Sequence, residues 1–115
     1  MKRLTILAVA VTTLAITPVG SAHANTTTIQ VKGGEFYFKL STKTIAKPGK
    51  VTFVFKNVGH VIHDFRIAGK TTRLIPPGTT TRLLVTFKKK GHYPYSCTVL
   101  GHAAAGMRGV FTVRW

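Results

Sequence analysis

The chain has 115 residues, of which 17 are lysine or arginine, two are acidic and one is cysteine, so its formal net charge is +15. This length fits one domain, and 44% hydrophobic residues are enough for a packed core. With Glu35 and Asp64 as the only acids, paired-carboxylate catalysis and a calcium cage are excluded. A single cysteine also excludes an internal disulfide, a Cys-x-x-Cys redox pair and a multi-cysteine zinc site.

The first 24 residues have the pattern of a secretory signal peptide. Residues 1–3 are Met-Lys-Arg, an apolar run covers residues 4–16, and Ala22 and Ala24 are the small residues that a signal peptidase reads. The apolar run is shorter than the roughly 20 residues that a membrane-spanning helix needs. We therefore expect cleavage after Ala24. Residues 25–115 would then form one exported domain, periplasmic or extracellular and soluble.

After the signal peptide, the chain shows the period of β-strands. Apolar and polar residues alternate in residues 36–40, 51–56, 82–87 and 111–115. Side chains of a strand point alternately to the two faces of a sheet, so each run is expected to bury one face. The runs are separated by turn residues: Gly33-Gly34, Pro48-Gly49, Asn57-Val58-Gly59, Pro76-Pro77-Gly78 and Gly91. About seven short strands predict an all-β, antiparallel sandwich or barrel.

Four side chains with metal-binding chemistry stand out in this strand pattern. Cys97 is followed by His102 after five residues and by Met107 after five more, and His63 lies upstream. Two imidazoles, a thiolate and a weak thioether are the ligand set of a blue-copper site. Cys97 closes a strand and Met107 precedes the next, so the loop between them can direct three ligands to one point. His63 has the parity of an inward-pointing strand residue.

Each of these residues also has an ordinary structural interpretation. Taken singly, the thiol is a small buried hydrophobe, the histidines are loop or core residues and the thioether fills the core. Their joint occurrence in this order favours a metal site, and an unpaired thiol in an oxidising compartment needs a reason. We expect His60 and His92 to be exposed in turns, although His60-x-x-His63 leaves open a second surface metal contact.

The residues around the four candidates resemble the cupredoxins, small blue copper proteins of the plastocyanin and azurin type. The likeness covers nearly all of residues 25–115. It is carried by Phe36-Tyr37-Phe38, Pro48 to Phe53, Asn57 with Gly59, His63, Gly91 to Cys97, Gly101-His102 and Ala105-Gly106-Met107. It implies a Greek-key sandwich of about seven to eight strands and one copper ion held by His63, Cys97, His102 and Met107. It also implies a shuttle for single electrons, with His102 the most exposed ligand.

The chain departs from the family pattern in two places. The family often has Asn after the first histidine ligand, but here the residue is Asp64. An ionised carboxylate only accepts hydrogen bonds, so a tie between the ligand loops has to come from donors such as the Thr98 hydroxyl or backbone N–H groups. A carboxylate beside the copper should also lower its reduction potential. The loop around His102 is longer than in plastocyanin, which leaves the copper–Met107 distance open.

The charge predicts an anionic partner. Cleavage removes two basic residues, so 15 basic and two acidic residues remain, giving a formal charge of +13. This charge should steer the protein toward an acidic redox partner, a membrane redox complex or the anionic membrane surface. We expect an apolar contact patch around His102 with a basic rim, and a monomer. Export argues against nucleic acid as the partner.

Other functions remain open at this point. A multicopper oxidase domain would need histidines where Ser96 and Thr98 flank the cysteine, and a dinuclear copper site would need a second cysteine. We therefore expect no enzyme. A copper carrier that delivers the ion without redox cycling is the main alternative to the electron shuttle. A metal-free secreted β-sandwich that binds an anionic partner is the third.

Overall fold

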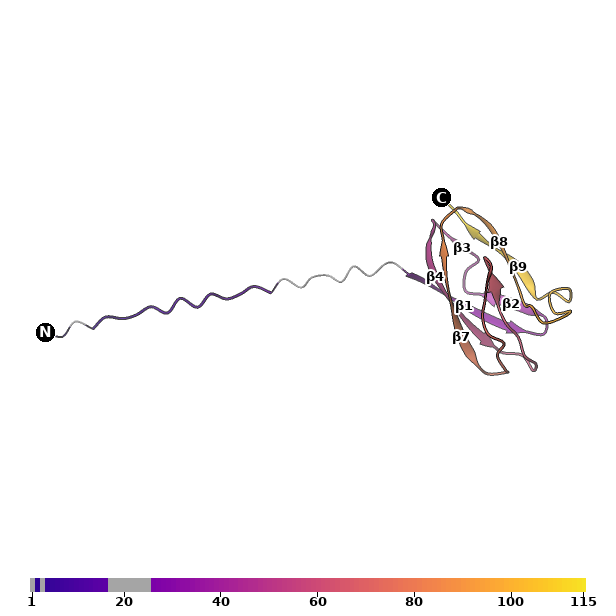
Figure 1. The fold of residues 1–115 in the computed structure, drawn as a ribbon, viewed down its shortest axis with the longest axis horizontal. Helices are drawn as coiled ribbons and strands as arrows, with labels where there is room; N and C mark the ends of the chain where they lie inside the picture. Colours follow the sequence, from indigo (N-terminus) through magenta and orange to yellow (C-terminus); the bar gives the residue numbers. More distant parts are fainter. Residues whose placement is uncertain (1, 3, 17–25) are drawn as a thin grey trace.

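The computed structural model describes residue 2, residues 4–16 and residues 26–115. Residues 26–115 form a sandwich of two sheets, and residues 4–16 extend away from it without helix or strand (Figure 1). The expected cleavage after Ala24 lies outside the described residues. In the described part of the chain, no helix is long and apolar enough to cross a membrane.

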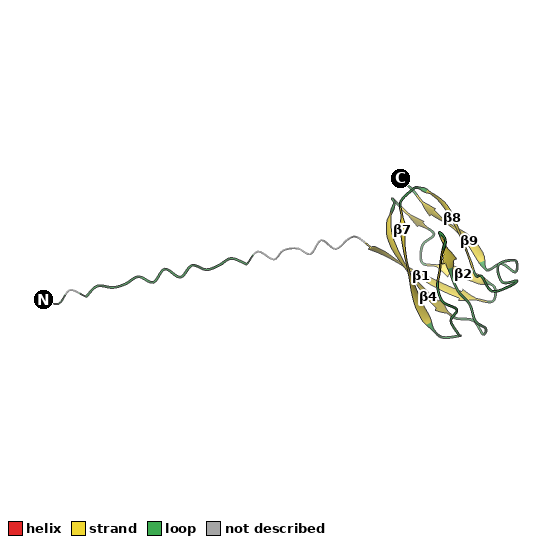
Figure 2. Cartoon of the chain, viewed as in Figure 1, coloured by secondary structure: helices red, strands yellow, loops and turns green. Residues whose placement is uncertain are grey.

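Two sheets of strands pack face to face (Figure 2). The strands are β1 (Thr26–Gly34), β2 (Tyr37–Leu40), β3 (Thr44–Ile45), β4 (Gly49–Asn57), β5 (Arg66–Ile67), β6 (Lys70–Thr71), β7 (Thr80–Phe87), β8 (Gly91–Ser96) and β9 (Arg108–Val113). The first sheet has the order β2-β1-β4-β7 and the second the order β3-β9-β8-β5-β6. The chain passes repeatedly between the sheets, which confirms the predicted all-β, Greek-key sandwich.

The strand count and the strand directions differ in detail from the sequence prediction. The described residues contain nine strands, because β3, β5 and β6 are two-residue segments that alternation cannot reveal. Both sheets are mixed, since β1 pairs in parallel with β4 and β3 in parallel with β9. The expected antiparallel pairing therefore holds for the other strand pairs but not for these two. Alternation shows which side chains of a strand face inward. It does not show whether two strands that are distant in the sequence pair in parallel or antiparallel.

The core is aromatic and lies between the sheets. The predicted alternation is confirmed in β4, where Val51, Phe53 and Phe55 are all 0% exposed. The Phe65 ring packs against rings from both sheets, with its centroid 5.3 Å from that of Phe53 and 5.7 Å from that of Tyr95. Tilted and edge-on contacts of this kind add stability beyond the burial of area. This packing fixes the segment that carries His63.

Two aromatic residues that the alternation placed in the core lie outside it. Phe36 is 41% exposed because it belongs to the turn between β1 and β2, and its ring packs against His102 with centroids 4.9 Å apart. Trp115 is 88% exposed because β9 ends two residues earlier, at Val113. His92 is exposed as expected, but it lies within β8 rather than in a turn.

The candidate ligands gather at one end of the sandwich, called the site end below. Cys97 follows directly on β8, and Met107 directly precedes β9. The β1–β2 turn with Glu35 and the connection from β4 to β5 with His63 lie at the same end. Residues 88–90 join β7 to β8 at the opposite end, about 20 Å away along the six residues of β8.

Candidate metal centre

Three side chains bring donor atoms to one point at the site end. Nδ1 of His63 lies 3.1 Å from Nδ1 of His102, and Sγ of Cys97 lies 3.9 Å and 3.7 Å from these two nitrogens. A point equidistant from the three atoms lies about 2.1 Å from each, close to metal–nitrogen and metal–sulfur bond lengths in proteins. The spacing therefore fits one small metal ion held by two imidazoles and a thiolate.

His63 is fixed by backbone pairing beside β5. Its N–H donates to the carbonyl of Ile75 at 3.2 Å, and the N–H of Ile75 donates back to the His63 carbonyl at 2.9 Å. His63 and Phe65 are both 0% exposed, which confirms the predicted inward parity. The imidazole thus enters the site from a segment that the core holds in place.

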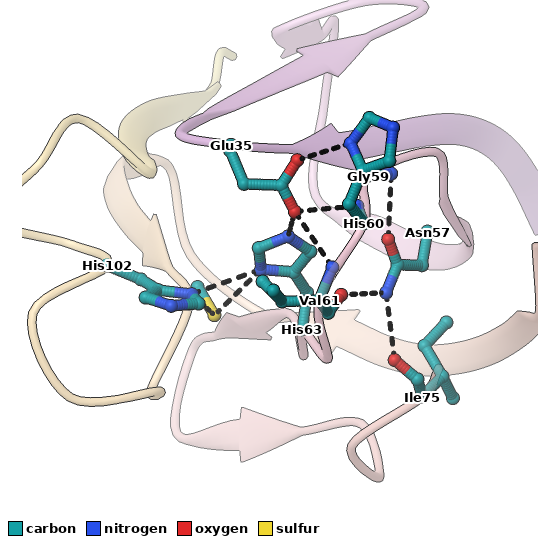
Figure 3. A network of polar contacts seen from close by, with 9 residues as sticks. Glu35, Asn57, Gly59, His60, Val61, His63, Ile75 and His102 are labelled. Carbon is teal, nitrogen blue, oxygen red and sulfur yellow. Dashed lines mark hydrogen bonds and ion pairs between the residues drawn. The ribbon is translucent and has the colours of Figure 1, made fainter. Parts of the chain in front are cut away.

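Asn57 supports this segment from the end of β4. Its buried amide Nδ2 donates to the carbonyl oxygens of Val61 at 2.8 Å and Ile75 at 2.9 Å, and its Oδ1 accepts the N–H of Gly59 at 2.9 Å (Figure 3). One side chain therefore satisfies three backbone groups around the turn that leads to His63.

The loop from Cys97 to Met107 folds back on itself. The N–H of Cys97 donates to the carbonyl of Met107 and the N–H of Met107 to the carbonyl of His102, both at 3.1 Å. Gly106 has φ of 125° in the left-handed region, and a Cβ there would lie 2.9 Å from the carbonyl oxygen of Phe36. The loop therefore closes tightly against the β1–β2 turn and brings its three candidate ligands to the site end.

Met107 lies in the interior at the inner side of this loop. It is 0% exposed, and its Cε lies 3.1 Å from the place that a Cβ at Gly33 would occupy. A glycine at this point of β1 leaves room for the thioether.

A carboxylate ties the two ligand segments together, as the sequence indicated. Asp64, which follows His63, accepts the backbone N–H of Thr98 at 2.6 Å on Oδ1 and the Thr98 hydroxyl on Oδ2. Thr98 follows Cys97, so this pair of hydrogen bonds joins the neighbours of two donors. Asp64 is only 3% exposed.

A second carboxylate, which the sequence analysis did not place at the site, contacts His63 from the other side. Oε1 of Glu35 lies 3.0 Å from Nε2 of His63 and accepts the backbone N–H groups of His60 at 2.8 Å and Val61 at 3.0 Å (Figure 3). The His60 N–H, followed by His63 and Val61, holds the pKa of Glu35 at about 2, against an opposing effect of desolvation.

A signal for Glu35 was present in the composition. Glu35 is one of only two acidic residues in a chain with 17 basic ones, which sets it apart. In the structure Glu35 contacts His63, and the other acid, Asp64, is the next residue after His63. The proximity itself depends on how the β1–β2 turn meets residues 59–63, which no local pattern shows. His60 is 94% exposed in its side chain, and its Nδ1 lies 3.4 Å from Oε2 of Glu35, outside the cluster of donors.

The thiol of Cys97 is held in its protonated form when no metal is bound. Burial raises the pKa of the Cys97 thiol above its ordinary value of 9.0. Because the thiolate is the form that binds a metal, metal binding has to displace this proton.

The fold and the site together define a small β-sandwich metalloprotein with two nitrogen and two sulfur donors at one end. Residues 4–113 match the family model of the cupredoxin-like domain, so the chain belongs to this family. The chemistry of the donors also fits, since two imidazoles, a thiolate and a thioether favour copper over harder ions. His63, Cys97, His102 and Met107 are arranged as a type 1 copper site for one copper ion.

Solved structures share the fold. Dithionite-reduced auracyanin from Roseiflexus castenholzii is 23% identical over 77% of this chain and 98% of its own, with a TM-score of 0.68. Auracyanin A from Chloroflexus aurantiacus, described as a "blue" copper protein, is 22% identical over 77% and 99%, with a TM-score of 0.64. The copper nitrite reductase of Nitrosomonas europaea matches at 19% identity over 77% of this chain but 41% of its own, with a TM-score of 0.63. No curated protein matches the chain significantly.

Proposed function

We propose that this protein is a mononuclear type 1 copper protein that shuttles single electrons between redox partners in the cell envelope. The observation that carries the proposal is the convergence of His63, Cys97 and His102 on one point from segments that hydrogen bonds fix. Copper bound there supplies one-electron cycling between its two oxidation states. The chain supplies the donors and limits how far they move.

The hydrogen bonds that hold the donor residues in place favour an electron shuttle over a protein that delivers the ion. His63 is paired with Ile75 through the backbone, and Asp64 joins its segment to the one that carries Cys97. Donors held in this way change little between the two oxidation states, which keeps electron transfer fast. Burial of His63, Cys97 and Met107 also hinders an acceptor that would remove the ion through its ligands.

The four donors also favour a carrier over an enzyme. A catalytic metal site keeps an open position for substrate or water. Here three donors surround the candidate position, and the buried Met107 lies on the inner side of the same loop. We therefore propose that His102, which is half-buried, is the route by which electrons enter and leave.

We propose that the partner docks at the site end. Exposed apolar side chains from three loops lie there: Phe36, Val61, Ile62 and Leu100. Arg66 and Arg108 both lie opposite Ser96 in the sheet, one strand to either side, and supply a basic rim. An acidic redox protein or membrane complex would suit this combination. Residues 88–90, at the far end, would add only long-range attraction.

Repeated redox cycling tests the proposal. The protein is loaded with copper(II), reduced with dithionite and reoxidised with ferricyanide in the presence of a copper(I) chelator. A shuttle keeps its copper and recovers its visible spectrum over successive cycles. Rapid loss of copper(I) to the chelator would indicate a delivery protein, and failure to take up copper at all would indicate a metal-free binding protein.

A further inference from the structure

We infer that Glu35 is a positioning residue of the metal centre, which holds the His63 imidazole as the tautomer that presents an unprotonated Nδ1 to the metal and makes that nitrogen a stronger donor. The inference rests on the proposed role of His63 as a copper ligand. Its first consequence, the tautomer of His63, can nevertheless be measured in the metal-free protein.

The hydrogen-bond geometry dictates the tautomer. Oε1 of Glu35 lies 3.0 Å from Nε2 of His63, and an ionised carboxylate can only accept. A neutral imidazole carries one N–H, so the proton has to be on Nε2 and the lone pair on Nδ1. That lone pair faces Nδ1 of His102 and Sγ of Cys97. In the metal-free protein, His102 therefore donates across the 3.1 Å contact between the two rings.

The carboxylate is held in place independently of His63. Oε1 also accepts the backbone N–H groups of His60 and Val61, which lie in a different segment from the β1–β2 turn. A Cβ at Gly59 would collide with Oε1, so the absence of a side chain there makes room for this approach. Glu35 is thus positioned before a metal arrives.

The charge of Glu35 is not used for ordinary ion pairing. Within the described residues, the basic side chains that contact it are those of His60 and His63, and no lysine or arginine forms an ion pair with it, although the chain has 17 of them. The partner that is buried is His63, at 0% side-chain exposure, whereas His60 is 94% exposed. A charge-assisted bond to a buried imidazole is the stronger of the two contacts.

The hydrogen bond has a redox consequence. A carboxylate on the far nitrogen of a ligating imidazole raises the basicity of the near nitrogen, and removing such a partner typically weakens metal binding about 10–100-fold. The more positive oxidised ion gains more from the stronger donor. If only copper(II) affinity falls, each tenfold loss raises the one-electron reduction potential by about 59 mV.

The test compares Glu35→Ala and Glu35→Gln with the parent protein. Thr86→Lys is the matched control, because it changes the net charge by the same amount on an exposed position of β7 six residues beyond the strand's site end. Nitrogen-15 NMR of the metal-free protein reads the His63 tautomer, and chelator competition and voltammetry read copper(II) affinity and potential. We expect Nε2–H in the parent protein and in Glu35→Gln, whose amide oxygen still accepts. Glu35→Ala should lose this fixed tautomer, bind copper(II) about 10–100-fold more weakly and show a higher potential.

Several results would overturn the inference. One is a parent protein with the His63 proton on Nδ1. Another is a Glu35→Ala protein whose copper(II) affinity and potential equal those of Thr86→Lys. If Glu35→Ala fails to fold, Glu35→Gln decides, since an unchanged potential after loss of the charge would contradict the account. Failure of the parent protein to bind copper would instead overturn the proposed function and leave the tautomer result standing.

Discussion

At the scale of single residues, the site is built around two carboxylates with opposite surroundings. Asp64 is buried and joins Thr98 to the His63 segment, while Glu35 is one-quarter exposed and accepts three N–H groups on one oxygen. Both place negative charge near the donors in a chain that is otherwise strongly basic. Both acidic residues of the chain therefore lie at the site.

The close approach of Gly59 to Glu35 predicts a selective effect of a single methyl group. Gly59→Ala should push the Glu35 carboxylate away from His60 and His63 and lower the free energy of unfolding by about 1–3 kcal/mol. Gly49→Ala is the matched control, because a Cβ there meets nothing within 4 Å. Urea unfolding of the metal-free proteins measures both. Equal stabilities of the two variants would show that Glu35 is not confined as described.

The raised pKa of Cys97 predicts the pH dependence of copper uptake. The pKa of the thiol is raised by burial, so the metal-free protein carries the proton at neutral pH and binding releases it. The apparent copper affinity should therefore rise about tenfold per pH unit between about pH 7 and 8.5. Chelator competition across this range measures the slope. An affinity independent of pH would mean that the thiolate is already present without metal.

At the scale of elements, the connection from β4 to His63 depends on one amide side chain. Asn57→Ala should remove the side-chain donor from the carbonyl groups of Val61 and Ile75, of which Ile75 keeps the N–H of His63, and should lower the free energy of unfolding by about 1–3 kcal/mol. The amides of His63 and Ile75 should then exchange faster with solvent. Asn57→Asp keeps the acceptor for the Gly59 N–H but turns a carboxylate oxygen toward the carbonyl oxygens of Val61 and Ile75, so it should be no more stable than Asn57→Ala. An Asp variant as stable as the parent would contradict this role.

The strands and turns also show which features the sequence could predict and which it could not. Alternation placed His63 and the β4 side chains correctly, because burial on one face of a strand is a local property. It misplaced Phe36 and Trp115, which lie just beyond strand ends that only tertiary pairing defines. The contact between Glu35 and His63 joins two turns 28 residues apart, and no periodicity encodes it. The candidate ligands could be recognised in the sequence, but the contact between the Glu35 carboxylate and His63 could not.

At the scale of the whole molecule, the ionisation of Tyr95 makes the free energy of unfolding depend on pH in the alkaline range. Burial raises the pKa of Tyr95 above its ordinary value of 10.0, so above that pH the folded state holds a proton that the unfolded state has lost. Stability from this group is fully present below pH 10 and falls as pH rises, by at most about 1.4 kcal/mol per unit.

Tyr95→Phe checks this link, since it removes the ionisable group and keeps the ring that packs on Phe38 and Phe65. Unfolding curves between about pH 9 and 11.5 should be flatter for the variant than for the parent. Parallel curves would assign alkaline unfolding to other groups.

The net charge of the whole molecule should affect association with the partner rather than binding of the metal. The chain has 17 basic and two acidic residues, and both acids lie at the site. If an acidic partner docks at the site end, its rate of electron exchange should fall as salt screens the attraction. A rate insensitive to ionic strength would assign docking to the apolar side chains alone.

The most direct test of the account is a titration of the protein with copper(II), followed by visible absorption and electron paramagnetic resonance. We predict one copper per chain, an intense thiolate-to-copper band, and loss of that band in Cys97→Ser. Copper bound without such a band, or with the same spectrum in Cys97→Ser, would contradict a site formed by His63, Cys97, His102 and Met107.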